Sequence, residues 1–548
     1  MPISPASVPI SSATATRPGR AVYAAAVLAP LAYGALSLWM GQDANWDLRN
    51  YHFYNAYAFL HGRLGFDMAV AHHATFYNPL PDLPFYALVT TLPPRATGFV
   101  MGAIQGLDFL LIMAIAWRVL AIARPMVRDG AAIAVAALGM LGSGTLSEIG
   151  TTFQDNMVSL FVLAALAGLV LSYRQLVESP LKQALRIAAG MGLVCGLGAG
   201  LKQTAVIYAL GICFALLLVT TDWRRRFLLA YVFGLGVIAG MAATGGFWMW
   251  TLWRDYGNPL FPYYNHIFKS PWALEADYLN REFLPKSFWE ALIYPFIFAT
   301  DPFRVGEIPF RGLRIPLLYA LAIVAVLAWP LRALWAGPGT LRLCDRYPAI
   351  FVIAAAAVAY LAWLKMFGVY RYLVPLEMLT PLLILLLVDR LALPRWAHGA
   401  LLGGIMAAIL ATSQPGNWGR ANWADDYFGV KAPAISDPKN AMVVMTGTEP
   451  LGYAIPFFPP EVPFIRIEGW FTGPGAKESR YDLEMRRRVA THVGPLYAFF
   501  RARYEHERTV KALAAYGLKL RAPACVTFKP HMDIVVDEVL AFCPLDRL

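Results

Sequence analysis

Long apolar runs recur along most of this chain, and they constrain its fold more than any other feature. Each run is close to the roughly 20 residues that a helix needs to cross the hydrocarbon core of a bilayer. Charged residues make up only 15% of the sequence, whereas about a quarter is usual in soluble domains. These patterns predict a polytopic α-helical membrane protein.

Charges alternate between the breaks that separate the apolar runs. Basic residues gather at every second break, as Arg224, Arg225 and Arg226 do, and the intervening breaks carry more acids, such as Asp43 and Asp47. This is the positive-inside pattern, which places the basic breaks and the N-terminal tail in the cytoplasm. Topology therefore explains the net charge of +11, and we expect no nucleic-acid partner.

We expect residues 1–413 to form a membrane module of about eleven helices, the first of them retained rather than cleaved as a signal peptide. Residues 187–220 are too long for one crossing and short for two, so we predict two short helices that break near "GLKQT". The other spans are expected near residues 21–40, 98–117, 130–147, 156–172, 227–250, 315–331, 348–367, 373–389 and 397–413. This arrangement leaves the N-terminus in the cytoplasm and the C-terminus outside.

The composition changes after the last apolar run. Residues 414–438 are polar and rich in Gly, Pro and Asn, which is typical of a linker. Residues 439–548 indicate a small extracytoplasmic α/β domain, because short apolar runs alternate there with amphipathic segments. Strands are expected in "AMVVMTG", "PFIRIEG", "LYAFF" and "CVTFK", and helices in "ESRYDLEMRRRVATHV" and "RYEHERTVKALAAYG". Since this compartment would be oxidising, we predict a Cys525–Cys543 disulfide.

Polar and aromatic side chains gather in the outward-facing breaks. The first outer loop, 41–97, begins "GQDANWDLRNYHFYNAY" and contains "FYNAYAFLHGRL", which predicts an amphipathic helix lying on the membrane; a large outer loop spans 251–313. Charges at a membrane boundary are costly and usually serve a function. We therefore expect a site on the outer face that draws on Asp43, Trp46, Asp47, Tyr51, His52, His72, His73, Asn78, Asp155, Lys202, Glu307, Arg371 and Tyr372.

The segment "WDLRNYHFYNAYAFLHGRL" resembles the first outer loop of the lipid-dependent glycosyltransferases of the GT-C superfamily. Their usual motif is an acid followed by aromatic or His residues and a helix with the pattern small-x-x-Leu-x-Gly-Arg/Lys. The segments "YNPLPDLPFY", "TTFQDNMVSLFVLAALAGLVL" and "GAGLKQTAVIYAL" are similar to further segments of that family. Asp47 takes the motif position, and Leu48 replaces the frequent second acid, which Asp43 could supply instead.

The resemblance implies a glycosyltransferase that moves a sugar from a polyprenyl-phosphate carrier to a lipid, glycan or protein acceptor on the outer face of the bacterial inner membrane. Asp47 would be the general base of an inverting transfer, supported by Asp43 and Asp155. Lys202 and Arg371 would neutralise the leaving phosphate, and the other members of the set would bind substrate. We assign no cofactor, although paired carboxylates could hold a divalent cation.

Two other functional classes share some of these features. A polysaccharide polymerase or ligase also uses lipid-linked glycans, but it would depend on basic loop residues rather than on an acid in the first loop. A secondary transporter also places charges in broken helices. Asp47 itself has a structural alternative, because its carboxylate could cap the helix that follows.

Overall fold

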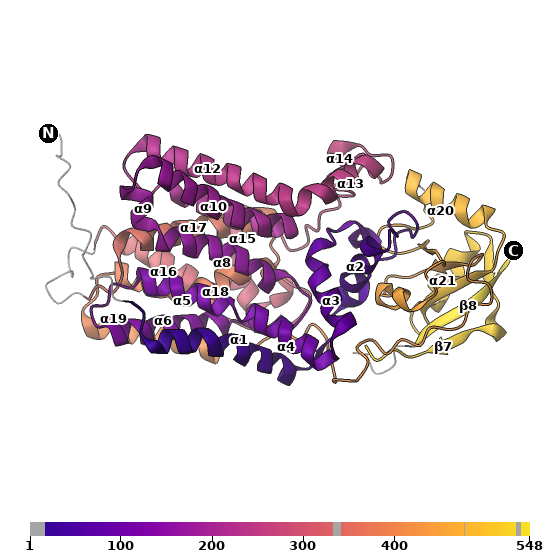
Figure 1. The fold of residues 1–548 in the computed structure, drawn as a ribbon, viewed down its shortest axis with the longest axis horizontal. Helices are drawn as coiled ribbons and strands as arrows, with labels where there is room; N and C mark the ends of the chain where they lie inside the picture. Colours follow the sequence, from indigo (N-terminus) through magenta and orange to yellow (C-terminus); the bar gives the residue numbers. More distant parts are fainter. Residues whose placement is uncertain (1–16, 332–340, 476, 533–538) are drawn as a thin grey trace.

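The structure, a computed structural model, describes residues 17–331, 341–475, 477–532 and 539–548. A long helical bundle fills one end of the molecule and a small α/β domain the other, with helices of the first outer loop between them (Figure 1). The bundle contains α1 (Arg20–Met40), α4 (Pro94–Gln105), α5 (Asp108–Val119), α6 (Pro125–Met140), α7 (Ser143–Ser147), α8 (Asp155–Leu171), α9 (Tyr173–Glu178), α10 (Leu181–Leu201), α11 (Val206–Leu216), α12 (Trp223–Met241), α15 (Phe288–Thr300), α16 (Arg314–Ala328), α17 (Arg346–Met366), α18 (Val374–Arg390) and α19 (Arg395–Ala411). Two further helices, α13 (Phe247–Tyr256) and α14 (Asn265–Phe268), extend from α12 towards the C-terminal domain (Figure 1).

Six helical segments are long and apolar enough to cross a membrane within the described residues. They are Arg20–Met40, Pro94–Val119, Leu181–Leu201, Trp223–Tyr256, Arg346–Met366 and Tyr370–Arg390. Five shorter apolar helices accompany them: Asp155–Leu171, Gln203–Leu216, Phe288–Thr300, Arg314–Ala328 and Arg395–Ala411. The chain therefore has the helices of a membrane protein by length and composition, while the number of crossings, expected to be about eleven, stays a prediction.

The predicted break in residues 187–220 is confirmed, because α10 ends at Leu201 and a short 3-10 turn, Gln203–Ala205, separates it from α11. The expectation of one continuous span over 130–147 is wrong. There α6 ends at Met140 and α7 begins at Ser143. The interruption has a physical cause, since the buried Glu377 of α18 accepts hydrogen bonds from the backbone N–H groups of Gly144 and Thr145.

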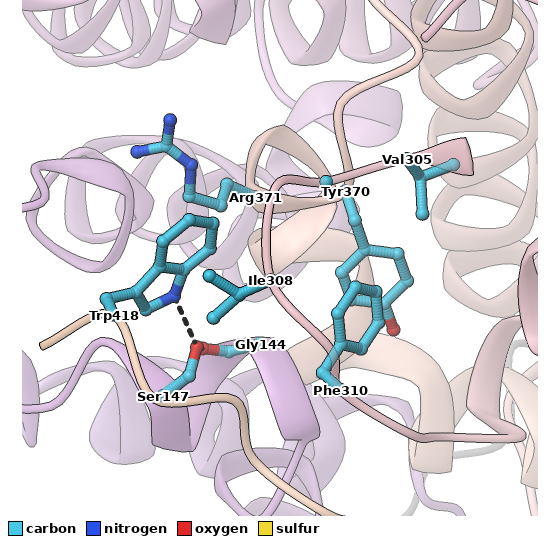
Figure 2. Close-up of a pocket in the computed structure, with 9 residues that line it drawn as sticks. Gly144, Ser147, Val305, Ile308, Phe310, Tyr370, Arg371 and Trp418 are labelled. Atoms are coloured by element: carbon cyan, nitrogen blue, oxygen red, sulfur yellow. Dashed lines mark hydrogen bonds between the residues drawn. The ribbon is translucent and has the colours of Figure 1, made fainter. Parts of the chain in front are cut away.

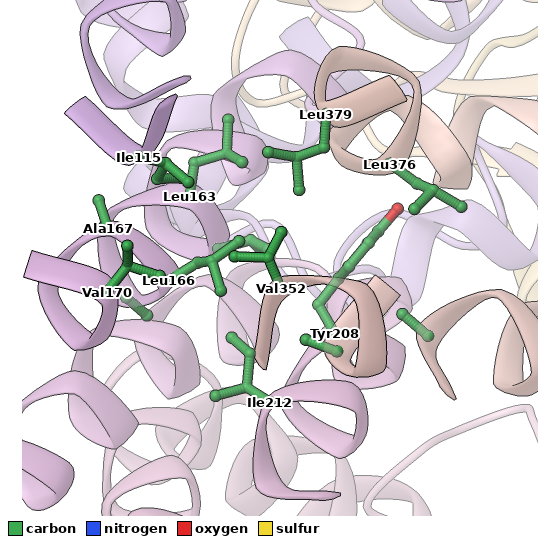
Figure 3. Close-up of a cluster of buried hydrophobic side chains, with 14 of the residues drawn as sticks. Ile115, Leu163, Leu166, Ala167, Val170, Tyr208, Ile212, Val352, Leu376 and Leu379 are labelled. Atoms are coloured by element: carbon green, nitrogen blue, oxygen red, sulfur yellow. The ribbon is translucent and has the colours of Figure 1, made fainter. Parts of the chain in front are cut away.

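The bundle packs around α18, which is buried along almost its whole length. Figure 3 shows part of this core, where side chains of α8, α11, α17 and α18 meet: Leu163, Leu166, Val170, Ile212, Val352, Leu376 and Leu379. Glycines bring α10 and α12 unusually close. A Cβ on Gly192 or Gly196 would lie 2.2 Å from a backbone oxygen of α12, the kind of small-residue contact that lets membrane helices approach.

The C-terminal domain is a mixed sheet with strand order β4-β3-β5-β8-β6, and β7 pairs with β8. Its elements are β3 (Met442–Met445), β4 (Phe464–Arg466), α20 (Arg480–Thr491), β5 (Leu496–Arg501), α21 (His506–Ala514), β6 (Leu518–Leu520), β7 (Val526–Phe528) and β8 (Leu540–Arg547). The four expected strands and both expected helices are confirmed. The sequence pattern missed β6 and β8, because β8 contains Pro544 and ends in charged residues, which obscures the usual strand signal.

The first outer loop is joined to this domain rather than lying free on the membrane. Its helix α2 (Phe53–Leu60) is buried from Phe53 to Ala58, so the expected interfacial helix is mostly covered by protein. The backbone of Met68 exchanges hydrogen bonds with Phe464 and Arg466 of β4, which extends the edge of the sheet. The loop also contains α3 (Leu83–Thr91). Loop and domain therefore form a single packed unit.

Residues 414–438, expected to be a linker, are also packed. Two of them form β2 (Arg420–Ala421), which pairs antiparallel with β1 (Gln42–Asp43) of the first outer loop. The Trp423 indole donates to the Leu38 carbonyl at 2.8 Å, and its ring occupies the place where Gly98 has no side chain. This predicted linker is therefore packed along the protein, because aromatic side chains anchor it to the membrane module.

The predicted Cys525–Cys543 disulfide is present, with α-carbons 4.1 Å apart. It encloses a loop with a sequence separation of 18, for which the chain-entropy account gives a stabilisation of about 3 kcal/mol. Replacing both cysteines by Ser should therefore make the C-terminal domain of the full-length protein markedly more sensitive to limited proteolysis. Equal digestion rates, or two free thiols by non-reducing mass spectrometry of exported protein, would refute this expectation.

Candidate functional site

Asp47 lies where the first outer loop turns into a short π-helical segment, Leu48–His52, a few residues after α1 ends. Its carboxylate makes no capping hydrogen bond to that segment, so the capping alternative is wrong. Instead Oδ2 accepts a hydrogen bond from the Tyr51 hydroxyl at 3.3 Å and lies 3.4 Å from Nη1 of Arg371. The side chain is 20% exposed. Asp47 is thus an accessible carboxylate that the local backbone does not use.

A wall of aromatic side chains borders Asp47. The Tyr51 ring meets the Tyr77 ring edge-on at 5.2 Å, and the Tyr77 hydroxyl lies 2.7 Å from that of Tyr263. Burial raises the pKa of Tyr51 well above its ordinary value, and the charge of Asp47 adds to the effect. The phenol therefore stays protonated and donates to Asp47 at any physiological pH.

His73 belongs to the same wall. Its ring lies 6.1 Å from the rings of Tyr77 and Tyr263. Burial lowers the pKa of His73 to about 4, against the opposing attraction of the Asp47 charge. The imidazole is therefore neutral near pH 7, and it contributes hydrogen-bonding capacity rather than positive charge.

Arg371 lies in the 3-10 turn Tyr370–Leu373 that precedes α18. Its guanidinium packs over two aromatic rings, with 4.3 Å to the Phe153 centroid and 4.8 Å to the Trp418 centroid. Figure 2 shows Trp418 beside Arg371, with the indole N–H bonded to the Ser147 hydroxyl at 3.1 Å. The rings fix the position of the cation without occupying its N–H donors, which leaves the donors for an anion.

Lys202 provides a second cation on the same side of the bundle. Its ammonium forms an ion pair with Asp155, the first residue of α8, at 2.6 Å, and lies 5.4 Å from the Tyr372 ring centroid. Tyr372 directly follows Arg371, so the same 3-10 turn contains one cation and contacts the other through the Tyr372 ring. The exposed Glu307 of the large outer loop also interacts electrostatically with Arg371.

Asp43 has a different environment from Asp47. It is 1% exposed, and its carboxylate accepts hydrogen bonds from the backbone and side chain of Thr152 at 2.8 and 2.9 Å. The backbone and side-chain amides of Asn45 donate to the other oxygen at 3.2 and 2.8 Å. We infer that Asp43 positions the first outer loop against the second outer loop, which is the segment 148–154 between α7 and α8.

Asp43→Ala is expected to destabilise the protein because it leaves several buried donors without a partner, at about 1–3 kcal/mol for each one that water cannot reach. A clear fall in the thermal midpoint of the full-length protein in detergent would show this. Asp43→Asn, which keeps one accepting oxygen, should lie between Asp43→Ala and wild type. Unchanged stability in Asp43→Ala would remove the positioning role.

Two further residues of the expected set are held by structural hydrogen bonds. Nδ1 of His52 lies 2.6 Å from Asp82, and Gln154 donates to the same carboxylate oxygen at 2.5 Å. The Asn78 side chain donates to the backbone oxygens of Gly200 and Thr244 at 3.0 and 2.9 Å. These bonds tie the first outer loop to the second one and to the broken helix pair, which positions the site without contributing to its open surface.

Trp46 and His72 lie on the side of the site that faces the C-terminal domain. Both rings are stacked with Trp470 of that domain, at centroid distances of 5.3 and 5.7 Å. Sequence reasoning did not single out Trp470, since aromatic residues in a Gly-rich turn carry no functional signal by themselves.

Sequence reasoning also missed two buried carboxylates and Trp418. Glu377 accepts hydrogen bonds from Thr145 and, at 2.9 Å, from the Tyr370 hydroxyl beside Arg371. Neither oxygen of Glu148 has a hydrogen-bond partner among the described residues; burial and the neighbouring Asp155 raise the pKa of Glu148 well above its ordinary value. The association of these two acids with apolar runs could have indicated them. Trp418 gave no such signal, because it lies in the segment that was expected to be a linker.

The carboxylates do not fit the divalent cation considered above. Asp43 is occupied by amide and hydroxyl donors, Asp155 by Lys202, and Asp47 by Tyr51 and Arg371. Within the described part of the chain, no group of three or more His, Cys, Asp or Glu side chains is arranged to hold a metal ion. We assign no metal ligands.

No protein-family model, curated protein or solved structure matches this chain.

Proposed function

We propose that this protein is an integral membrane glycosyltransferase. It would transfer a hexosyl or pentosyl group from a polyprenyl-phosphate carrier to a lipid, glycan or protein acceptor at the outer face of the bacterial inner membrane. The observation that carries the proposal is the Asp47–Arg371 pair, which places an accessible carboxylate 3.4 Å from a cation that aromatic rings hold in place. A base and a phosphate-binding group are the two components that such a transfer needs.

Asp47 would act as the general base. An acceptor hydroxyl bound within hydrogen-bond reach of Oδ2 gives its proton to the carboxylate while its oxygen attacks the anomeric carbon. The bond from that carbon to the phosphate oxygen breaks, and the lipid phosphate leaves with the electron pair. Attack and departure on opposite sides invert the configuration. The Tyr51 hydroxyl, 3.3 Å from Oδ2, orients the carboxylate.

Arg371 would bind the donor phosphate and stabilise it as it leaves. Its planar N–H donors match phosphate oxygens, which offer a stronger paired contact than the 3.4 Å approach to Asp47. A bound donor would thus draw Arg371 away from Asp47 and free the base for the acceptor. Lys202, already paired with Asp155 at 2.6 Å, would add positive charge near the same phosphate.

The height of the site supports a donor dissolved in the bilayer. The first candidate span ends at Met40 and the last one begins at Tyr370, so Asp47 and Arg371 lie at the end of the spanning segments. A polyprenyl chain would remain among the helices while its phosphate reaches this boundary. The alternation of basic and acidic loops supports an outer-face position for this boundary.

A reporter fusion is expected to establish this orientation. An enzyme that is active only in the periplasm should be active when it is fused after Leu548, since the proposed topology puts the C-terminal domain outside the cytoplasm. The same reporter fused before Arg20 should be inactive. A strong signal from a cytoplasm-only reporter at the C-terminus would contradict the proposed crossings.

Sugar transfer by membranes that carry the protein tests the function itself. Labelled polyprenyl-phosphate hexose or pentose should lose its sugar to an endogenous acceptor in these membranes, and membranes without the protein should leave the donor intact. A polymerase or ligase would instead consume a lipid-linked oligosaccharide, and a transporter would move its substrate without breaking a bond. Either of those results would replace the proposal.

A further inference from the structure

Three aromatic rings meet at the junction between the first outer loop and the C-terminal domain. Trp46 directly precedes Asp47, His72 directly precedes His73, and Trp470 comes from the turn after β4. The interplanar angles are 11° for Trp46 with Trp470, 23° for His72 with Trp470 and 12° for Trp46 with His72. The three rings are therefore nearly parallel, although they come from two parts of the chain that are far apart in sequence.

The surrounding backbone holds His72 firmly in this arrangement. Its Nδ1 accepts a hydrogen bond from the Trp470 backbone N–H at 3.2 Å, so Nε2 is free to donate to the Thr448 carbonyl, also at 3.2 Å. Gly469 makes the close approach possible, because a Cβ there would lie 2.5 Å from the His72 ring. His72 itself has φ 55°, a conformation that is costly for a non-glycine residue and tends to persist at functional sites.

The turn that carries Trp470 is equally well fixed. The Gly469 N–H donates to the Thr472 carbonyl at 2.9 Å, and the Thr472 hydroxyl donates to the Arg466 carbonyl at 2.7 Å. Arg466 is fully buried and donates to the Val70 carbonyl of the first outer loop at 2.9 Å. Trp470 nevertheless remains 61% exposed. A rigid support thus presents a large aromatic ring to solvent.

Polar groups continue from the same turn into an open pocket. Glu468, Gly473 and Pro474 line a cavity of about 420 Å³ together with Arg508 and Lys511 of α21. Glu468 and Arg508 form an ion pair at its wall. An exposed aromatic face next to charged hydrogen-bonding groups is the combination that binds a sugar, whose C–H face stacks on a ring while its hydroxyls bind polar groups.

We propose that Trp470, backed by Trp46 and His72, is a stacking surface for a sugar ring of a carbohydrate acceptor, so that the C-terminal domain supplies part of the acceptor site. The inference rests on the proposed function, because it takes Asp47 as the base beside Trp46. It narrows the acceptor to a glycan or a glycan-bearing molecule. The glycan would extend from Asp47 across the rings toward the pocket lined by Glu468 and Arg508.

Saturation-transfer NMR on the full-length protein in detergent tests the stacking surface without requiring turnover. The probes are linear trisaccharides of glucose, galactose, mannose and N-acetylglucosamine. At least one should bind wild type, and Trp470→Leu should weaken that binding about tenfold, which corresponds to about 1.4 kcal/mol and is within reach of one good aromatic contact. Trp470→Phe, which keeps a ring, should retain most of the affinity.

Two controls make the result specific: a variant elsewhere in the protein and a comparison of thermal stability. Trp396→Ala removes another exposed indole, on α19 and away from the junction, and should leave binding unchanged. Equal thermal midpoints for Trp470→Phe and Trp470→Leu would show that the difference between them is not unfolding. Equal trisaccharide binding by these two variants, or no binding of any probe by wild type at about 10 mM, would overturn the inference.

Asp47→Asn separates this inference from the proposed function. It should retain trisaccharide binding while losing transfer, because the base takes no part in stacking. Trp470-dependent binding by a protein that transfers no sugar would refute the function and leave the binding site in place. If transfer depends on Asp47 but trisaccharide binding does not depend on Trp470, the function stands and the proposed stacking surface is refuted.

Discussion

Asp47→Asn is expected to lower sugar transfer about a hundredfold or more while leaving expression and thermal stability unchanged. The amide has nearly the same shape as the carboxylate, and its oxygen can still accept a hydrogen bond from Tyr51. It cannot accept the proton of an acceptor hydroxyl. Because the Asp47 carboxylate caps no helix, the change removes no backbone hydrogen bond. It does remove the negative charge opposite Arg371, so an unchanged thermal midpoint is the control that assigns the lost activity to the base.

The matched variants for Asp47 are Asp47→Glu and Asp43→Asn. Glu keeps a base but moves it by one methylene, so partial activity is expected. Asp43→Asn tests a carboxylate that lies close by in sequence and is fully hydrogen-bonded. This change should affect the thermal midpoint more than the rate of transfer. Full transfer by Asp47→Asn would overturn the assignment. The base would then be sought first at Asp155, one of whose oxygens has no hydrogen-bond partner among the described residues.

Arg371→Met is expected to reduce donor use by about a hundredfold to a thousandfold, which is typical when one group that stabilises a developing negative charge is removed. Met retains much of the packing against Phe153 and Trp418 but none of the charge. Arg371→Lys keeps the charge without the planar donors, and it should recover only part of the activity. Initial rates at increasing concentrations of labelled polyprenyl-phosphate sugar would measure both effects.

Lys202→Met should act in the same direction, with one complication that the geometry makes clear. Lys202 is paired with Asp155, which is 5% exposed, and removal of one partner leaves a buried charge uncompensated. The double variant Lys202→Met/Asp155→Asn removes this penalty and is the proper measure of the role of Lys202. Normal donor use by Arg371→Met and by the double variant would eliminate the phosphate-binding role of both cations.

Periodicity was sufficient to predict the helical part of the chain with its long apolar helices, the break at Lys202 and six elements of the C-terminal domain. These features follow from local composition, because apolar length, glycine and alternating side chains act over short stretches of chain. The sequence also indicated Asp47 and Arg371 separately, as charges at the ends of apolar runs. Their pairing across more than three hundred residues depends on tertiary packing.

The packing of the linker, the interruption of the span over 130–147 and the role of Asp43 share one physical cause, which is contact between distant segments. The supposed linker is packed because Trp418 and Trp423 find partners on α7, on α1 and at Gly98. The expected span over 130–147 is interrupted because Glu377, far along the chain, binds the start of α7. Likewise, Asp43 resembles Asp47 in sequence, but its hydrogen bonds from Thr152 distinguish this buried positioning carboxylate from the accessible carboxylate of Asp47.

Lipid analysis of a deletion strain tests the central claim most directly. Polyprenyl-phosphate lipids would be extracted from wild type, from the deletion strain, and from the deletion strain complemented with wild-type protein or with Asp47→Asn. If the protein transfers a sugar from such a carrier, mass spectrometry should show one polyprenyl-phosphate sugar accumulating in the deletion strain and in the Asp47→Asn strain, and returning to its normal level with the wild-type protein. Identical lipid profiles in all four strains would contradict the account.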